Sequence, residues 1–506
     1  METKKSNSII IKNATFLYIR MFISMAIGFY TSRVVLQALG VEDFGLFNII
    51  AGVIVLMSSM NGSLSSASSR FMSFNMGDKN SLNKTFTNAF LIHLAVSAFV
   101  LIIGETVGLW FINTQLTIDP ERVFAANCVY QATLVSTVLG ITQIPYNASI
   151  IAHERMNVFA VVEILNSILK LVIALCVLYV PFKDSLIQYS LLYTLVSIII
   201  MLVYRFYCSR NFPECHVSFK IDRYLVKQML EFIGWNMFSE ICFSFRQQGL
   251  NVILNRTFGT ILNAAAGVAL QVQAILYGFI GNITTAFKPQ IIKNFAEKNY
   301  ERCNELILTG AKFTSFFMIL ISLPVLINLE YLMSMWLGDV PEGAVVLGKI
   351  CIIQNIVNSF NAMPSTTIVA TGKLKKVCVY GGIMHVLCIV AAFIALKFTH
   401  LYYIVYVVSV LFTFFFCVLN ILLAKQQFFE FSHIKYIVGI LLPMSLIFIS
   451  NVLFVNYLYQ YLSEGVIKLL LTSVTSTVVV SILTFLLVLD KKEKNLIVRK
   501  IKKCRI

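Results

Sequence analysis

Residues 377–396 read VCVYGGIMHVLCIVAAFIAL, twenty residues without Asp, Glu, Lys or Arg. A helix needs roughly 20 apolar residues to cross a bilayer core about 30 Å thick. Comparable stretches fill most of the 506 residues, 58% of which are hydrophobic, and the mean hydropathy is +0.82. We predict an all-α membrane protein with about fourteen transmembrane helices, over residues 9–38, 44–75, 85–112, 123–146, 156–180, 185–204, 228–255, 261–287, 305–328, 343–371, 377–396, 402–424, 436–456 and 469–489.

The distribution of basic residues predicts how these helices are oriented. In the tails, the connections and the adjoining helix ends, 29 Lys and Arg side chains fall on one side of the membrane and 5 on the other. Because cytoplasmic loops of membrane proteins are enriched in Lys and Arg, we expect both termini in the cytoplasm, which requires an even number of crossings. The formal charge of +16 is therefore a topology signal. It does not indicate nucleic-acid binding.

A long basic connection after the sixth helix divides the chain. We expect the last two helices, which are uniformly apolar, to pack on the outside and face lipid. The predicted domains are an N-terminal six-helix lobe (1–208), a basic cytoplasmic linker (209–227), a C-terminal six-helix lobe (228–424), and two extra helices with a basic cytoplasmic tail (425–506).

A weak internal repeat supports two similar lobes. The segment from Gly40 to Lys79–Asn80 matches the segment from Gly259 to Lys298–Asn299 at a constant offset of 219 residues. A repeat of six helices keeps its orientation in the membrane, so the lobes should be related by a pseudo-two-fold axis along the membrane normal. We expect two six-helix lobes that face each other.

Two helices in corresponding places of the lobes are unusually polar. The second predicted span carries many serines between residues 58 and 69, and its partner in the second lobe carries glutamines and Asn282. Small hydroxyl residues also occur at close contacts between membrane helices. A polar run that covers every face of a helix exceeds one contact stripe, so we favour the lining of a water-filled cavity.

Charged residues deep in the predicted helices are few and mostly cationic. Arg20, Lys170 and Arg246 lie near mid-span, where a charge costs a few kcal/mol. Arg33 lies nearer the outer end of its helix and either reaches the lipid headgroups or enters a cavity. A cavity that holds such cations attracts an anion, and the guanidinium fork matches phosphate oxygens.

The embedded carboxylates allow two interpretations. Glu163 lies seven residues before Lys170 on the same helix face, about 10 Å away along the axis, so the two form an internal salt bridge or belong to the substrate path. Glu240 and Arg246 differ by about 120° around their helix and should not pair. We predict substrate-binding cations at Arg20, Arg246, Lys170 and Arg33, and cavity or coupling residues at Glu163, Glu240, Ser59, Asn61, Ser66, Gln271 and Asn282.

Other kinds of site find little support. The eleven cysteines have no CxxC spacing, so we expect no metal centre, although Cys208, Cys215 and His216 share one loop. No phosphate-binding loop of the Walker type is present, and the external connections are only about a dozen residues long. We therefore predict no enzymatic activity and no bound cofactor.

The segment Thr31-Ser-Arg-Val-Val-Leu-Gln-Ala-Leu-Gly-Val-Glu-Asp-Phe-Gly-Leu-Phe-Asn48 resembles the polysaccharide transporter family. These proteins are the Wzx-type O-antigen and capsule flippases of the multidrug/oligosaccharidyl-lipid/polysaccharide (MOP) superfamily, which have a MATE-like fold. The characteristic part is Leu39-Gly40 followed by Phe44-Gly45-Leu46. The fourteen-span plan agrees with this family over essentially the full length.

The resemblance implies a multi-pass protein of the bacterial inner membrane. Its substrate would be an undecaprenyl-diphosphate-linked oligosaccharide, flipped from the cytoplasmic to the periplasmic leaflet by alternating access for lipopolysaccharide or capsule biosynthesis. The family implies a coupling cation, H⁺ or Na⁺, and partners such as a polysaccharide polymerase and other assembly proteins. Arginines in the central cavity of relatives are proposed to hold the diphosphate, and Arg20 and Arg246 fit by helix location.

Two rival functions remain. A MATE-like multidrug antiporter would export organic cations and should expose carboxylates, which are scarce here. A membrane-embedded polysaccharide polymerase or ligase would need a large external loop that carries acids or histidines, and the sequence has no such loop.

Overall fold

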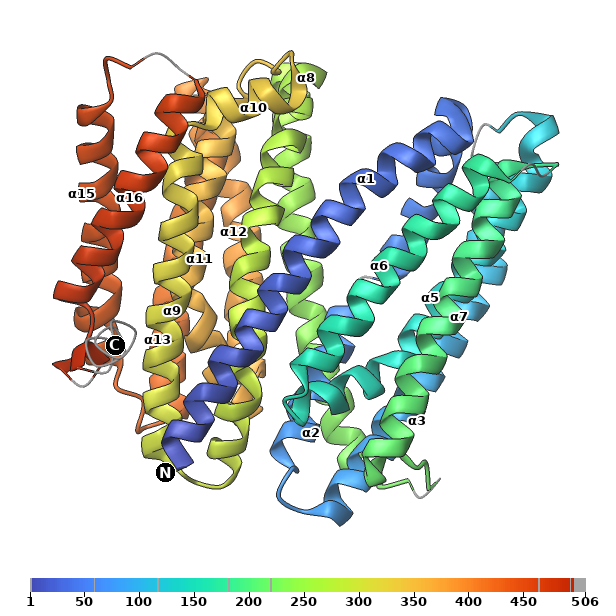
Figure 1. Ribbon diagram of the computed structural model, residues 1–506, viewed down its shortest axis with the longest axis horizontal. Coiled ribbons are helices and arrows are strands. Elements are labelled where there is room, and N and C mark those ends of the chain that lie inside the picture. The colour runs from blue at the N-terminus through green and yellow to red at the C-terminus, as the bar shows by residue number, and fades with distance from the viewer. Residues whose placement is uncertain are drawn as a thin grey trace, which may run out of the picture. The chain divides into compact units, whose positions relative to one another are not determined.

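The computed structural model describes residues 2–58, 60–115, 118–180, 183–218, 221–462, 465–491 and 493–495. These residues form helices and connecting turns without a β-strand (Figure 1). The chain divides into two compact units, unit 1 (residues 1–237) and unit 2 (residues 238–506). The division falls inside α8 (Arg223–Ala296), so the first turns of this helix belong to unit 1.

Unit 1 is a bundle of long helices. Its elements are α1 (Glu2–Ser58), α2 (Asn61–Phe74), α3 (Lys79–Ile103), the π-helical turn η1 (Gly104–Gly108), α4 (Leu109–Thr114), the 3₁₀ turn η2 (Pro120–Arg122), α5 (Val123–Ala152), α6 (Met156–Tyr179), α7 (Ser185–Asn211), the 3₁₀ turn η3 (Pro213–Cys215) and the start of α8. In this bundle α1 packs on α6, and α5 packs on both α3 and α7.

Unit 2 repeats this plan and adds two helices. It holds the rest of α8, then α9 (Tyr300–Ile327), α10 (Leu329–Leu337), α11 (Ala344–Thr371), α12 (Lys375–Thr399), α13 (Ile404–Gln427), α14 (His433–Tyr436), the π-helical turn η4 (Ile437–Leu441), α15 (Leu442–Leu458) and α16 (Val466–Leu487). Here α11 packs on α9 and α13, and α12 packs on α13.

Twelve helices among the described residues are long and apolar enough to cross a membrane. The all-helical, multi-pass architecture predicted from the sequence is thus confirmed. The predicted spans 44–75 and 228–255 are not among the twelve, although their described residues are helical. The first of these two spans contains the serine-rich stretch, and the second contains several charged residues.

Both α1 and α8 bend at a glycine. Gly40 has φ 76° and ψ 173°, and Gly259 has φ 81° and ψ −168°. This backbone region is accessible almost only to glycine, because a Cβ atom clashes there. The two glycines are the pair that the sequence repeat aligns, so corresponding helices of both units change direction by the same backbone device.

We expect Gly40→Ala and Gly259→Ala each to lower the free energy of unfolding by about 1–3 kcal/mol. No atom lies within 4 Å of the added Cβ at either site, so backbone strain accounts for the loss. Gly28→Ala also meets open space but lies in regular helix, and should be neutral or stabilising by about 0.5–1 kcal/mol. Thermal unfolding in detergent measures the difference, and equal melting temperatures for the three variants would contradict this explanation.

An ionic cluster fixes the first residues after the α1 bend. Arg122 donates from Nε and Nη2 to the carboxylate of Asp43, and from Nη1 to Asp184 Oδ2 at 2.6 Å. Asp184 also caps α7, because its Oδ1 accepts from the backbone N–H groups of Leu186 and Ile187. One arginine therefore ties the bend in α1 to the beginnings of α5 and α7.

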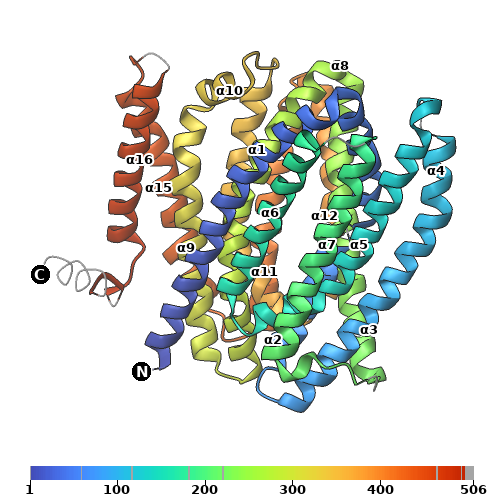
Figure 2. The same ribbon diagram turned by 45° about the vertical axis from the view of Figure 1, so that its right-hand side comes forward.

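The last two helices of unit 2 lie beside α9 (Figure 2). Their exposed faces are apolar, as expected of lipid-facing helices, but the expectation of uniformly apolar helices is wrong. The buried side of α16 carries Thr472, Ser476 and Thr484, and Asn328 Nδ2 donates to Thr472 Oγ1 at 2.7 Å. Small polar residues let membrane helices approach closely and add hydrogen bonds between them.

The chain after α16 is anchored to α9 by a buried lysine. Lys312 Nζ lies 2.9 Å from Asp490 Oδ2 and 2.8 Å from Glu493 Oε2. The lysine side chain is largely buried, so the two carboxylates compensate a charge that has little contact with water.

The end of α5 holds the connector that follows α7. His153 Nε2 lies 2.5 Å from Glu214 Oε1, and the His153 ring stacks on Phe212 with centroids 4.1 Å apart. Burial alone would raise the pKa of Glu214. The hydrogen bond with His153, a backbone hydrogen bond and the His153 charge outweigh it, so the pKa of Glu214 is lowered.

The Glu214 interaction should make stability depend on pH. A carboxylate with a lowered folded-state pKa stabilises the protein above the ordinary value of about 4.3 and loses this contribution as the pH falls. Glu214→Gln should therefore melt below wild type at about pH 7, and the gap should close towards about pH 3–4. Glu231→Gln, at an exposed position, is the control. A gap that does not change with pH would contradict the prediction.

Candidate functional site

In unit 1, Arg20 lies with residues of α6 and α7. Its guanidinium carbon is 5.0 Å from the centroid of the Phe159 ring. Tyr204 Oη donates to Glu163 Oε1 at 2.9 Å, and the charge of Glu163 acts on Arg20. Tyr204 is fully buried, whereas Arg20 is half-buried. The structure thus joins two predicted site residues, Arg20 and Glu163, with a tyrosine that sequence reasoning missed.

Lys170 lies on α6, the helix that also carries Glu163, but its surroundings differ. Its Nζ donates to Tyr193 Oη at 3.3 Å and lies 4.9 Å from the centroid of that ring. Phe47 from α1 packs edge-on against Tyr193 and Tyr189. The side chain is half-buried.

The salt bridge between Glu163 and Lys170 that the sequence allowed does not form among the described residues. Each side chain finds its own tyrosine on α7: Tyr204 for Glu163 and Tyr193 for Lys170. The tyrosines are eleven residues apart, roughly 16 Å along a helix. Packing of α6 against α7 therefore keeps the two charges apart and leaves Lys170 without a carboxylate partner.

In unit 2, Arg246 begins a chain of buried polar groups. It is 5% exposed, and its Nη1 donates to Thr413 Oγ1 at 3.5 Å. Gln354 Nε2 donates to the same hydroxyl at 2.9 Å and to Ser409 Oγ at 3.1 Å. Gln273 Nε2 donates in turn to Gln354 Oε1 at 3.1 Å. We call Arg246, Gln273, Gln354, Ser409 and Thr413 the Arg246 network.

Aromatic and weakly polar groups complete the surroundings of Arg246. Its guanidinium carbon is 5.1 Å from the Phe243 ring centroid, and the Cys388 side chain lies close to it. The Nε donor is buried without a protein partner. The guanidinium is thus held among helices of unit 2, with one donor left over for another oxygen.

The remaining predicted residues lie in varied surroundings. Arg33, Glu240 and Gln271 are exposed, and Asn282 is buried. Asn61 and Ser66 are half-buried on α2, whose Ser63, Ser68 and Ser69 are fully buried. Much of the serine-rich stretch is therefore packing surface, where small side chains let helices approach closely. Ser59 lies outside the described residues.

No group of His, Cys, Asp or Glu in the described part of the chain could hold a metal ion. Cys208 and Cys215 are buried, but His216 of the same connector is exposed. The cysteine pair therefore packs without the third ligand that a metal site would need.

Gln354 should be central to the Arg246 network, because its side chain bonds three others. We expect Gln354→Met to lower the free energy of unfolding by about 1–3 kcal/mol, since buried partners lose their hydrogen bonds. Gln271→Met, at an exposed position of α8, should change it little. Thermal unfolding in detergent measures both. Equal effects of the two substitutions would show that the network does not stabilise unit 2.

No protein-family model matches this chain, and no curated protein matches it. Several solved structures share its fold. A MATE transporter, solved in complex with MaD3S, superposes with a TM-score of 0.73 and 15% identity, over 83% of this chain and 96% of that one. A multidrug resistance MATE family transporter of the MOP superfamily, in an outward-facing conformation, superposes with a TM-score of 0.71, 14% identity and the same coverage.

A third structure is a MOP superfamily transporter from Pyrococcus furiosus, described as having a binding pocket of reverse polarity that suggests a different function. Its TM-score is 0.68 at 16% identity, over 83% of this chain and 96% of that chain. These likenesses concern architecture, because the identities are low. The chain is a multi-pass membrane protein with the fold of MATE and other MOP superfamily transporters.

Proposed function

We propose that this protein is a lipid-linked oligosaccharide flippase. It moves an undecaprenyl-diphosphate-linked repeat unit of a surface polysaccharide, of the O-antigen or capsule type, across the bacterial inner membrane by alternating access. Both termini then lie in the cytoplasm, and a polysaccharide polymerase and other assembly proteins receive the product. The transporter fold and the resemblance of residues 31–48 support this proposal.

The observation that carries it is positive charge kept within both units. Lys170 and Arg246 are held by hydroxyl groups and aromatic rings, and no carboxylate lies within ion-pair distance of either in the described residues. Such partners fix the position of a cation without cancelling its charge. A cation that is poorly hydrated and uncompensated attracts an anion strongly, and a diphosphate is the charged part of the proposed substrate.

The partners of Arg246 can be exchanged at low cost. Its hydrogen bond to Thr413 is long, at 3.5 Å, and phosphate oxygens accept shorter, charge-assisted bonds from guanidinium. The free Nε donor supports the same exchange. In unit 1, Arg20 and Lys170 supply further cations, whereas the exposed Arg33 is the weakest candidate.

Glu163 is the residue best placed to bind a coupling cation, H⁺ or Na⁺. Its carboxylate accepts a hydrogen bond from the buried Tyr204 and acts on Arg20. Protonation of Glu163 would leave Arg20 less compensated, so uptake of a proton would strengthen the attraction of Arg20 for an anion. This step would couple substrate binding to a cation gradient.

A MATE-like antiporter for organic cations is the second candidate. Glu163 and the exposed Glu240 are the carboxylates that would face such a substrate. The separation of Glu163 from Lys170 favours this alternative, because the Glu163 carboxylate forms no ion pair with that lysine and stays available for an organic cation.

Transport of a fluorescent undecaprenyl-diphosphate-linked oligosaccharide in proteoliposomes tests the proposal. We expect Lys170→Gln and Arg246→Gln each to reduce the rate at least tenfold, because a lost charge-assisted hydrogen bond costs about 1.5–3 kcal/mol and about 1.4 kcal/mol is a factor of ten. Arg256→Gln removes an exposed charge from α8, the helix of Arg246, and Lys12→Gln removes one from α1 of unit 1. Both controls should transport normally.

Two outcomes would overturn the proposal. One is full transport by both variants at unchanged melting temperature. The other is export of an organic cation by wild-type protein that does not move the oligosaccharide, with loss of export in Glu163→Gln. The second outcome would establish the antiporter.

A further inference from the structure

We infer that a groove between α3 and the start of α8 binds an anionic phospholipid, with its acyl chain on α3 and its phosphate on Arg223 and Lys227. The groove lies within unit 1 and contains none of the residues of the proposed transport site. The inference therefore stands or falls independently of the flippase proposal.

One face of α3 holds the connector that leads to α8. Asn83 Nδ2 donates to the backbone carbonyls of Glu214 and His216, both at 2.9 Å. One turn later, Thr87 Oγ1 accepts from the backbone N–H of Ser218 at 3.3 Å, and Asn88 Oδ1 accepts from that of Asp222 at 3.1 Å. These hydrogen bonds hold the connector against the polar end of α3.

Further along α3, the side chains beside the connector become apolar. Leu91, Ala95 and Phe99 continue the four-residue spacing of Asn83 and Thr87, in a row that turns by about 40° around the helix at each step. Together with Ile221, Val226 and Leu230 they border a cavity of about 380 Å³. Its lining also includes Ile92 and Val96 and contains no polar side chain.

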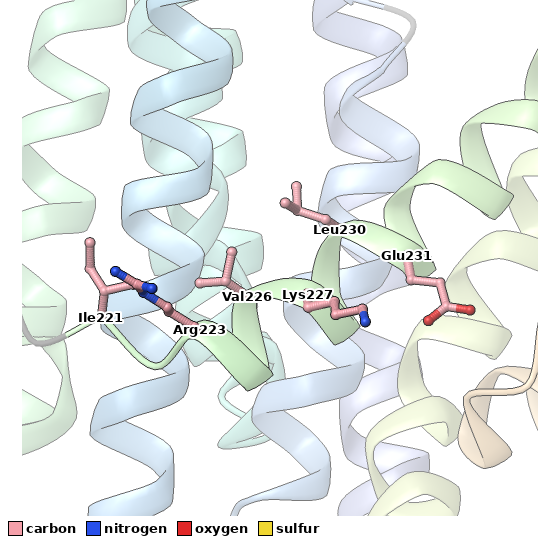
Figure 3. Close-up of a pocket in the computed structure, with 6 residues that line it drawn as sticks. All are labelled: Ile221, Arg223, Val226, Lys227, Leu230 and Glu231. Carbon is pink, nitrogen blue, oxygen red and sulfur yellow. The ribbon is translucent and has the colours of Figure 1, made fainter.

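Cations lie at one end of this apolar groove. A second cavity, of about 530 Å³, shares Ile221, Val226 and Leu230 with the first and adds Arg223, Lys227 and Glu231 (Figure 3). Arg223 and Lys227 are exposed, one helical turn apart, and neither forms an ion pair with a described residue. Because the shared residues make the two cavities contiguous, a ligand can occupy both.

The geometry of the connector fixes these cations in place. Asp222 caps α8, since its Oδ1 accepts from the backbone N–H groups of Tyr224 and Leu225, both at 3.1 Å. Further along, Met229, Phe232 and Ile233 are buried in unit 1. With the inner face of the helix anchored, Arg223 and Lys227 stay at the mouth of the groove.

An anionic phospholipid matches both the apolar floor of the groove and the cations at its mouth. The groove floor is the side of a membrane helix, and it changes from polar to apolar between Asn88 and Leu91, as the headgroup region of a bilayer changes to hydrocarbon. The residues that line the groove include two cations and one carboxylate, Glu231, and this balance favours a negative headgroup. Basic residues near the membrane surface strengthen the binding of anionic lipids.

Lipid titration followed by native mass spectrometry of the full-length protein tests the inference. Wild type should retain phosphatidylglycerol over phosphatidylethanolamine. The double variant Arg223→Gln/Lys227→Gln should bind phosphatidylglycerol roughly tenfold or more weakly and lose the preference. Ala95→Phe, which fills the apolar floor, should weaken the binding of both lipids.

Lys79→Gln/Lys84→Gln is the matched control, because it removes two exposed charges from the first turns of α3, outside the groove. It should bind lipid as wild type does. Equal losses in both double variants, or normal binding by Ala95→Phe, would overturn the proposed site. Preferential retention of undecaprenyl phosphate over phosphatidylglycerol would overturn the choice of a phospholipid. Melting temperatures near wild type show that each variant is folded.

Discussion

A positive charge among apolar helices must be met by side chains of its own bundle, because hydrocarbon provides no water to solvate it. In this protein, aromatic rings and hydroxyl groups surround these charges. Lys170 contacts the ring and hydroxyl group of Tyr193, and Arg246 contacts the ring of Phe243 and the hydroxyl group of Thr413. Such partners lower the cost of burial while the charge itself remains. The interpretation of the protein as an anion carrier depends on this retained charge.

Features that depend on local sequence could be predicted. The apolar lengths identified the membrane-spanning helices, and the offset of 219 residues paired Gly40 with Gly259 before their shared backbone geometry was visible. The helical placement of Arg20 and Arg246 also followed from the sequence. The bends themselves were predicted only as turns, since a glycine pattern does not distinguish a turn from a helix that continues across a kink.

Features that depend on contacts between distant segments could not be predicted. Gln354 and Thr413 join Arg246 only after three helices pack, and Tyr204 reaches Glu163 across 41 positions of the chain. The outcome for Glu163 and Lys170 could not be predicted for the same reason. Helical spacing allowed the two side chains to pair, but each contacts a tyrosine of α7 instead. Mid-span polar residues such as Gln354 were the available signal.

The anchoring of Lys312 by Asp490 and Glu493 has a mechanical consequence. To slide α9 away from the end of α16 would strip a buried ammonium of both counter-charges at once. The polar contacts of α16 with the end of α9 add to this resistance. When unit 2 changes conformation, α9 and α16 should therefore travel as one rigid block, and the flexing should fall on other helices.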